Sequence, residues 1–395
     1  MDLNGFLRYA VDNGASDIHL KVGRPPVLRR DGGLVAIETG PLDETALNAI
    51  LQIVGARSPE RLAAFDATGD LDIAYQSEDL PRFRVNAYRQ RGATSFAFRV
   101  IPREVPTLED LKLPGVVRTL AEEHRGLILV TGATGSGKTT TLAAMIEHMN
   151  RTRSQHIITI EDPIEILHPD RGCIVNQREI GLDTVDFGQA LRRALRQDPD
   201  IILIGELRDA ETAQTALQAA ESGHLVLSTL HTIDAAETVG RMVEFFPAEK
   251  QVVIRAILAG VLRGVISQRL LPKEGGGRVA AIEAMVMNSR ISDLIREGRT
   301  DEITDAVAEG EYFGMQTFSR ALIAHVLSGA VDREVAANAS TQRHDFLVAL
   351  ERAEKRHRAD AAAVEAPAPA AVSLQAGEEL EPEEPHPGLR IVPAT

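Results

Sequence analysis

One octapeptide constrains this chain more than any other stretch. Residues 132–139 read GATGSGKT and fit the pattern G-x-x-x-x-G-K-[ST] throughout. The apolar run LILVT precedes them and predicts a buried strand, and TTLAAMIEHM follows with a helical pattern. Glycines at these positions let backbone N–H groups turn inward around phosphate oxygens, and the helix adds its N-terminal dipole. The octapeptide therefore predicts a nucleotide-phosphate site made by Gly132, Ala133, Thr134, Gly135, Ser136, Gly137, Lys138, Thr139 and Thr140.

Two side chains of this loop have predicted roles toward ATP and Mg²⁺. Lys138 is expected to reach the β- and γ-phosphates, and the Thr139 hydroxyl is expected to bind Mg²⁺. The alternative is a chance glycine turn, which the flanking strand and helix disfavour.

A phosphate loop needs an acid near the metal on a second strand. Residues 201–204 read IILI, and Glu206 follows at the carboxyl end, where open α/β sheets bind ligands. The usual Asp is replaced by Gly205, so we expect Glu206 to serve Mg²⁺ through a water molecule. The alternative is an exposed glutamate at the start of a loop.

A second acidic segment, IEDPIE at 160–165, follows another short apolar strand. Its three carboxylates lie within five residues and would repel one another without a nearby cation or hydrogen-bond donors. The spacing favours a role with a metal or a water molecule, and a solvated acidic turn is the alternative.

Two histidines, His224 and His231, flank the predicted strand LVLST at 225–229. A neutral imidazole can contact a γ-phosphate or a carboxylate, although a single histidine is as often structural.

Arginines are crowded on one predicted hairpin of this acidic chain, around Arg91-Gly92. An exposed sheet face with salt bridges would explain them. The other interpretation is an arginine finger offered to the nucleotide of a neighbouring subunit, which requires an oligomer. The hairpin arginines are Arg82, Arg84, Arg89, Arg91 and Arg99.

The composition predicts four main pieces in these 395 residues, with a short helix end before the last of them. Residues 1–100 mix a short helix with alternating strands, and 101–117 form a proline-containing linker. Residues 118–345 alternate apolar strands and helices, which indicates a mostly parallel sheet covered on both faces. A helix end at 346–359 precedes a tail at 360–395, which holds 6 Pro and 7 acidic residues against one Arg and is expected to be disordered.

Several classes of protein are disfavoured. The net charge of −14 argues against a general nucleic-acid binder, and the single cysteine, Cys173, excludes a disulfide framework or a Cys₄ zinc site. No stretch reaches about 18 uninterrupted apolar residues, and the first residues do not resemble a signal peptide. The longest apolar helix candidate, residues 252–266, is interrupted by arginines and glycines. A cytosolic, soluble protein is expected.

With these motifs in place, the chain resembles the type IV pilus retraction ATPases (PilT) of the secretion-ATPase superfamily over about residues 1–345. GASDIHL at 14–20 and the arginine hairpin are similar to that family's PAS-like domain. The loop at 132–139 resembles its Walker A motif, 160–165 its Asp box, 201–209 its Walker B motif and 222–232 its His box. SRISDLIRE at 289–297 resembles its retraction motif, with Asp293 in place of an Asn, and GMQTF at 314–318 also fits.

The resemblance implies an α/β protein with an N-terminal PAS-like α+β domain and a RecA-like P-loop domain, assembled as a homo-hexamer. It implies that Glu165 polarises water, that Glu206 is the Walker B acid, and that His224 and His231 couple the nucleotide to the interface. Arg84 and Arg99 match arginines lent across that interface.

In that family, ATP hydrolysis drives pilin removal at the cytoplasmic face of the inner membrane, with a platform protein as partner. A pilus-assembly or type II secretion ATPase and an accessory retraction paralogue are alternatives with the same chemistry. Assembly motors usually carry a further N-terminal domain and a four-cysteine zinc site. A RecA-like nucleic-acid translocase and a non-enzymatic nucleotide-sensing scaffold are further alternatives, which the charge and the glutamate pair disfavour.

Overall fold

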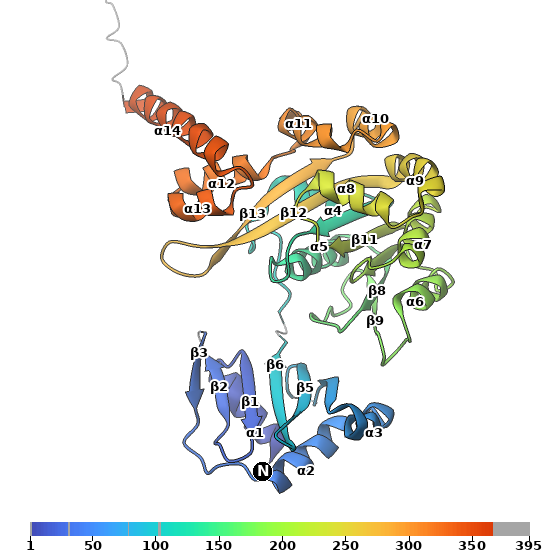
Figure 1. Cartoon of the computed structure of the whole chain (residues 1–395), viewed down its shortest axis with the longest axis vertical. Helices are drawn as coiled ribbons and strands as arrows, with labels where there is room; N and C mark the ends of the chain where they lie inside the picture. Colours follow the sequence, from blue (N-terminus) through green and yellow to red (C-terminus); the bar gives the residue numbers. More distant parts are fainter. Residues whose placement is uncertain (1, 31, 78, 102–103, 366–395) are drawn as a thin grey trace, which may run out of the picture. The chain divides into compact units, whose positions relative to one another are not determined.

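The computed structural model describes residues 2–30, 32–77, 79–101 and 104–365, and only the backbone of residues 360–365. The chain divides into two units, Met1–Leu347 and Val348–Thr395. The first unit contains two sheets, each with its own helices (Figure 1). In the second unit, the described residues belong to helix α14 (Arg343–Glu365).

The N-terminal domain is an antiparallel sheet in the order β3-β2-β1-β6-β5-β4, with three helices. Its elements are α1 (Leu3–Asp12), β1 (Asp17–Lys21), β2 (Val27–Arg30), β3 (Gly33–Ala36), α2 (Glu44–Gly55), α3 (Pro59–Thr68), β4 (Asp70–Tyr75), β5 (Phe83–Gln90) and β6 (Ala93–Val100). Alternate residues of β5 face the core, where Phe83 and Val85 are fully buried. The predicted hairpin is confirmed: Arg91 and Gly92 turn between β5 and β6 with φ of 54° and 82°.

The C-terminal domain is a sheet in the order β13-β12-β7-β11-β10-β8-β9, parallel except for β13. Its strands are β7 (Gly126–Thr131), β8 (His156–Glu161), β9 (Ile174–Glu179), β10 (Ile201–Ile204), β11 (Leu225–Leu230), β12 (Leu262–Pro272) and β13 (Arg278–Val286). Its helices are α4 (Gly115–Ala121), α5 (Lys138–Thr152), α6 (Phe187–Ala194), α7 (Ala210–Glu221), α8 (Ala235–Glu244), α9 (Ala248–Val261), α10 (Ser289–Glu297), α11 (Ile303–Ala308), α12 (Phe318–Leu327) and α13 (Arg333–Ala339), with single 3₁₀ turns η1 (Thr300–Glu302) and η2 (Glu311–Phe313). The predicted mostly parallel sheet is confirmed.

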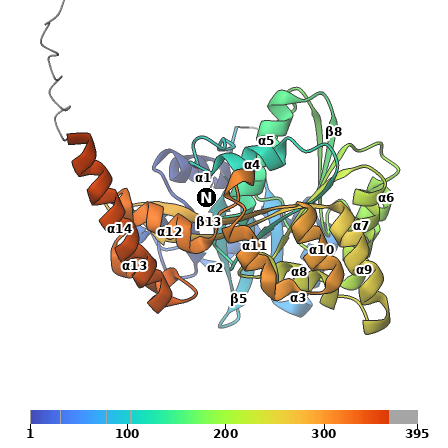
Figure 2. The ribbon, with the colours of Figure 1, turned by 90° about the horizontal axis from the view of Figure 1, so that it is seen from above.

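The central strands are apolar throughout because each of their faces packs against helices. In β7, Leu127 and Leu129 join the core under α6–α9, while Ile128 and Val130 join the core under α4 and α5. These two groups of helices lie on opposite sides of the sheet (Figure 2). Because both faces of these strands are buried, they lack the alternation of polar and apolar residues found in a sheet with one face exposed to solvent.

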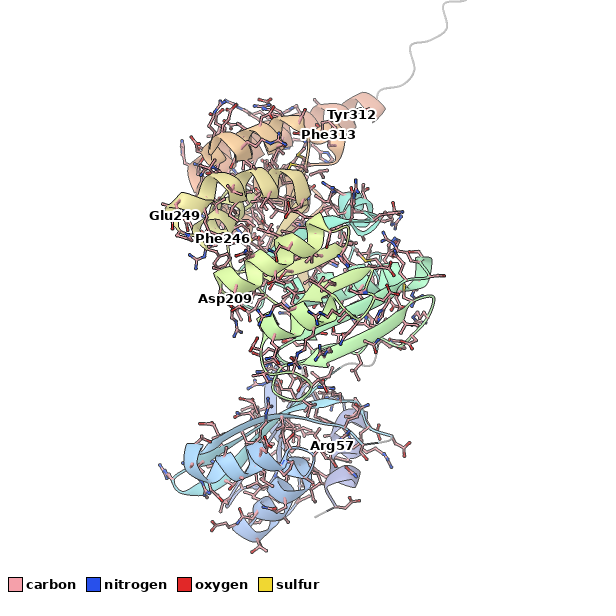
Figure 3. The ribbon with its side chains drawn as sticks, turned by 90° about the vertical axis from the view of Figure 1, so that its right-hand side faces the viewer. Arg57, Asp209, Phe246, Glu249, Tyr312 and Phe313 are labelled. Atoms are coloured by element: carbon pink, nitrogen blue, oxygen red, sulfur yellow. The ribbon has the colours of Figure 1, made fainter. Side chains whose placement is uncertain are left out.

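Short carboxylate side chains begin several of the helices that the sequence predicts. Asp209, which begins α7 (Figure 3), accepts a hydrogen bond from the N–H of Thr212 at 2.8 Å. Asp234 accepts a hydrogen bond from the N–H of Glu237 at 2.8 Å, and the Glu237 carboxylate accepts one from the N–H of Ile233 at 3.0 Å. These bonds satisfy N–H groups that have no partner within the helix. Helix α10 buries Ile291, Leu294 and Ile295, as its spacing predicts.

Three segments differ from the sequence-based expectation. The apolar candidate at 252–266 is a helix only to Val261, because β12 begins at Leu262 and pairs with β7. Within the expected linker at 101–117, Leu108 and Val117 are buried in the core under α4 and α5. The tail expected to be disordered begins inside α14, which continues through Glu365. Its alanine-rich start favours helix, and residues 366–395 lie outside the described part of the chain. Across the described residues, no helix has both the length and the apolar character that a membrane span needs.

A buried carboxylate lies where β13 meets the start of α8. Glu283 is 6% exposed, and its Oε1 accepts a hydrogen bond from the N–H of Ala235 at 2.9 Å. Burial raises the pKa of Glu283 to about 7, and the charge of Asp234 acts in the same direction. Backbone hydrogen bonds from Ala235 and Phe318 and the charge of Arg269 oppose this rise. The folded protein therefore holds a proton on Glu283 at pH values where an unfolded chain has released it.

This shift predicts that stability falls with rising pH. The proton on Glu283 contributes to the free energy of unfolding. This contribution is complete below the pKa of about 4.5 that Glu283 has in the unfolded chain, and it is lost as pH rises through the folded pKa of about 7. Glu283→Gln keeps a hydrogen-bond acceptor and removes the buried charge. We expect it to raise the free energy of unfolding at pH 8 by about 1–3 kcal/mol, and to change it little at pH 4.5. Urea unfolding at the two pH values measures this, with the exposed Glu211→Gln as control. An equal effect of Glu283→Gln at both pH values contradicts it.

Candidate nucleotide-binding site

The phosphate loop connects β7 to α5 and has the backbone that its glycines predict. Gly132, Gly135 and Gly137 have φ of 139°, 79° and 91°, a region that residues with a Cβ rarely adopt. At Gly132 a Cβ would lie 2.4 Å from the backbone oxygen of Gln268, so a larger residue cannot fit. Lys138 opens α5, and its Nζ donates to the backbone oxygens of Gly132 at 2.8 Å and Ala133 at 3.1 Å.

A cavity of about 720 Å³ lies over this loop. It gathers residues from four of the sequence motifs at the carboxyl ends of β7, β8, β10 and β11, as expected for an open α/β sheet. Among the residues that line it are Thr134, Gly135, Gly137, Lys138, Thr139, Thr140, Glu161, Asp162, Glu165, Glu206 and His231. The structure thus brings the predicted loop, both predicted glutamates and one predicted histidine to the same cavity.

The charges in this cavity affect one another. Burial lowers the pKa of Lys138, while the negative charges of Glu206 and Glu165 raise it and only partly compensate. Both glutamates therefore lie close enough to Lys138 to stabilise its ammonium group. A cation flanked by two carboxylates is the arrangement that a site for phosphate, metal and water requires.

Glu206 lies just beyond β10, beside an arginine and a histidine. Arg208 donates a hydrogen bond to its Oε1, and the Nε2 of His231 lies 3.2 Å from its Oε2. Burial alone would raise the pKa of Glu206, but the hydrogen bond and charge of Arg208, with His231 in support, lower it. Glu206 is therefore ionised at neutral pH.

The three carboxylates of the acidic segment line the same cavity but differ in burial and in hydrogen-bond partners, and the charge of Glu165 still acts on Glu161. Glu161 is buried, where its Oε1 accepts hydrogen bonds from Thr159 at 2.6 Å and Gln177 at 3.0 Å. Burial raises the pKa of Glu161 despite these bonds. Asp162 is exposed and lies 3.9 Å from Arg208. Glu165 is exposed and lines the cavity.

The structure does not bring His224 to this cavity. It precedes β11, while His231 follows that strand, so about 20 Å of strand separates them. The Nδ1 of His224 lies 2.9 Å from the backbone oxygen of Ala219 and 3.0 Å from Ser222 Oγ.

The hairpin arginines have different partners. Arg82 pairs with Glu179 on β9, Arg89 with Asp66 at 2.8 Å, and Arg99 with Asp17 at 2.9 Å. Arg99 also lines the nucleotide cavity. Arg84 lies directly opposite Arg99 in the sheet and, within the described residues, has no hydrogen bond or ion pair.

Two buried residues that support the site were missed from the sequence. Gln268 on β12 contacts the phosphate loop. Glu179 ends β9, where its Oε2 accepts the N–H of Ile164, one residue before Glu165, at 3.2 Å. Neither residue lies in a recognisable motif. The available signal in the sequence was a glutamine placed among the apolar residues of 262–272. A glutamine that is buried with such residues needs hydrogen-bond partners.

The oxygen donors present fit a magnesium ion that arrives with a nucleotide. Such an ion is typically held by one or two protein oxygens together with phosphates and water. The Thr139 hydroxyl and the Glu206 carboxylate line the same cavity. Within the phosphate loop, Ser136 Oγ is buried without a hydrogen-bond partner. The described residues include no cluster of three or more His, Cys, Asp or Glu that could hold a metal unaided.

Together, the two-sided parallel sheet, the phosphate loop and the acid beyond β10 define a RecA-like P-loop nucleotide-binding protein. Residues 2–275 match the family described as Type II/IV secretion system protein. The chain belongs to this family, in its PilT-like branch of secretion ATPases.

Individual relatives also support membership of the PilT-like secretion ATPases. The chain is 45% identical to the Type IV pilus retractation ATPase PilT of Pseudomonas aeruginosa, over 85% of this chain and 96% of that protein. It is 38% identical to the Type IV pilus ATPase PilU of the same organism, over 85% and 87%. A crystal structure of the pilus retraction motor PilT with bound ADP matches with a TM-score of 0.82 and 42% identity, over 87% of this chain and 98% of that one.

Proposed function

We propose that this protein is an ATP-hydrolysing motor that drives type IV pilus retraction. The observation that carries the enzymatic part is the meeting of Lys138, Glu165 and Glu206 at the cavity over the phosphate loop. Identity to PilT supports the biological part. The 45% identity over 334 residues exceeds the 38% to PilU and the 35% over 282 residues to the Type IV pilus assembly ATPase PilB of Thermus thermophilus.

Several groups of the cavity have a proposed part in hydrolysis. The backbone N–H groups of the loop and the Lys138 ammonium bind the phosphates of ATP, and Thr139 binds Mg²⁺ directly. When bound, Mg²⁺ neutralises charge on the transferred phosphoryl group. Glu206 would hold the metal through a water molecule, and His231 orients Glu206. Glu165 accepts a proton from the attacking water as that water reaches the γ-phosphate.

The assembly that we propose is a homo-hexamer in which neighbouring subunits complete the site. Arg84 has no partner within the described residues and lies next to Arg99 in the sheet, so its charge is available to a second copy. We propose that these two arginines contact the phosphates of a neighbour, where a guanidinium stabilises transition-state charge. His224 lies away from the cavity, and its proposed coupling role is at a subunit contact. The proposed partners are the inner-membrane platform protein and the pilin machinery.

A cell that lacks this protein is expected to keep or gain surface pili while it loses twitching motility. Pili that are extended but never withdrawn remain on the surface. Electron microscopy of pili together with a surface-motility assay tests this, and expression of the wild-type gene should restore movement while Lys138→Ala should not. Loss of pili in the deletion strain, restored by the wild-type gene, would overturn retraction in favour of assembly.

A further inference from the structure

A buried glutamine of β12 holds the middle of the phosphate loop. Gln268 is 1% exposed, and its Nε2 donates a hydrogen bond to the backbone oxygen of Ser136 at 2.6 Å. Its Oε1 accepts a hydrogen bond from Thr141 Oγ1, on the first turn of α5, at 2.9 Å. The same side chain therefore connects the loop, the following helix and the neighbouring strand.

The loop also approaches this strand so closely that glycine is required at two positions. A Cβ at Gly132 would lie 2.4 Å from the backbone oxygen of Gln268, and a Cβ at Gly137 would lie 2.8 Å from its Nε2. One residue before Gln268, the Ser267 hydroxyl accepts a hydrogen bond from Thr131, the last residue of β7, at 2.8 Å. Strand β12 thus fixes both ends and the centre of the loop.

The bond to Ser136 determines which way one peptide group faces. In a planar trans peptide, the C=O and the following N–H point in opposite directions. Because the Ser136 oxygen points toward Gln268, the Gly137 N–H points away from β12, and Gly137 lines the nucleotide cavity. Gly137 has a φ of 91°, and glycine's freedom makes the reversed peptide accessible. A reversed peptide would present a carbonyl oxygen to the phosphates and withdraw a donor from them.

We propose that Gln268 is a positioning residue that keeps the Ser136–Gly137 peptide in the orientation that binds phosphate. This proposal rests on the proposed function, in that the loop binds ATP. Gln268 itself does not line the cavity, so it acts through the loop. A purely structural role would require only that the buried amide has hydrogen-bond partners.

Two variants separate the donor bond from the acceptor bond. Gln268→Leu removes both bonds, to Ser136 and from Thr141, and we expect it to raise the Kd for Mg·ATP by about 10–100-fold, the range for a buried polar group left without a partner. Thr141→Val removes only the bond to Oε1 and is expected to change the Kd less than about threefold. Fluorescence titration with a labelled ATP analogue on the full chain gives the Kd, and thermal unfolding shows that each variant is folded. Gln251→Leu is the control, because Gln251 makes one backbone hydrogen bond, to Phe246 O, away from the cavity.

A third variant keeps the proposal testable if Gln268→Leu does not fold. In Gln268→Glu only the protonated carboxyl can donate to the Ser136 oxygen, so we expect its affinity relative to wild type to improve as pH falls from 8 to 6. A structural role predicts no such recovery. Wild-type Kd in a folded Gln268→Leu, or a pH-independent ratio for Gln268→Glu, would overturn the proposal. Failure of the wild-type protein to bind Mg·ATP would instead overturn the proposed function.

Discussion

Lys138→Ala is expected to reduce ATP hydrolysis by a factor of about 10³ or more. Lys138 is the one loop side chain that brings a positive charge to the cavity, and its Nζ now donates to the oxygens of Gly132 and Ala133. We expect those bonds to be exchanged for bonds to the β- and γ-phosphates when ATP binds. Without the ammonium group, Glu165 and Glu206 leave the cavity with negative charge that opposes the triphosphate. Phosphate release from purified protein at saturating Mg·ATP measures the rate.

The matched control for this variant is Lys250→Ala, on an exposed position of α9. It removes the same charge and side chain away from the cavity and should hydrolyse ATP at the wild-type rate. Binding of Mg·ATP to Lys138→Ala should weaken by about 10–100-fold, the range for charge-assisted hydrogen bonds. Turnover near the wild-type rate in folded Lys138→Ala would show that the loop is not the catalytic phosphate site.

Local sequence patterns predicted those parts of the fold in which nearby residues determine the structure. The four apolar runs that became β7, β8, β10 and β11 are buried on both faces, so hydrophobicity alone marks them. The Asp209 cap and the inner face of α7 follow from spacing within one helix, and Asp209 does accept the Thr212 N–H. The phosphate loop is equally local, because its conformation depends on its own glycines.

Pairing between segments that lie far apart in the sequence could not be predicted from local patterns. Strand β12 begins directly after α9, and the arginines and glycines in this stretch do not mark the residue at which the helix ends and the strand begins. Its strand conformation comes from pairing with β7, more than 130 residues earlier, and with β13. The role of Gln268 depends on that pairing and was missed with it. The hydrogen bond from Glu179 to Ile164 depends in the same way on β9 lying beside β8.

In the candidate site, too, local features were predicted from the sequence, and features that depend on the arrangement of distant segments were not. The sequence identified Glu165 and Glu206, and the structure places both at the cavity. The sequence did not indicate that Arg208 would pair with Glu206, because whether the two side chains meet depends on how the loop after β10 turns. His224 and His231 look equivalent in sequence. The direction of β11 puts them at opposite ends of the sheet, and His231 is the one beside Glu206.

Glu165→Gln is expected to lower turnover by about 10²–10⁴-fold, the contribution typical of a positioned general base, while Mg·ATP binding stays within a few-fold of wild type. The amide has the shape of the carboxylate but cannot accept the proton of the attacking water. Glu206→Gln provides the sharper comparison, since its carboxylate serves the metal. Raising the Mg²⁺ concentration should recover part of the activity of Glu206→Gln and none of that of Glu165→Gln. Glu211→Gln, which removes an exposed charge paired with Arg192 outside the cavity, is the control and should be as active as wild type. Full turnover in Glu165→Gln would remove this residue from the reaction, and Mg²⁺ rescue of both variants would assign both carboxylates to the metal.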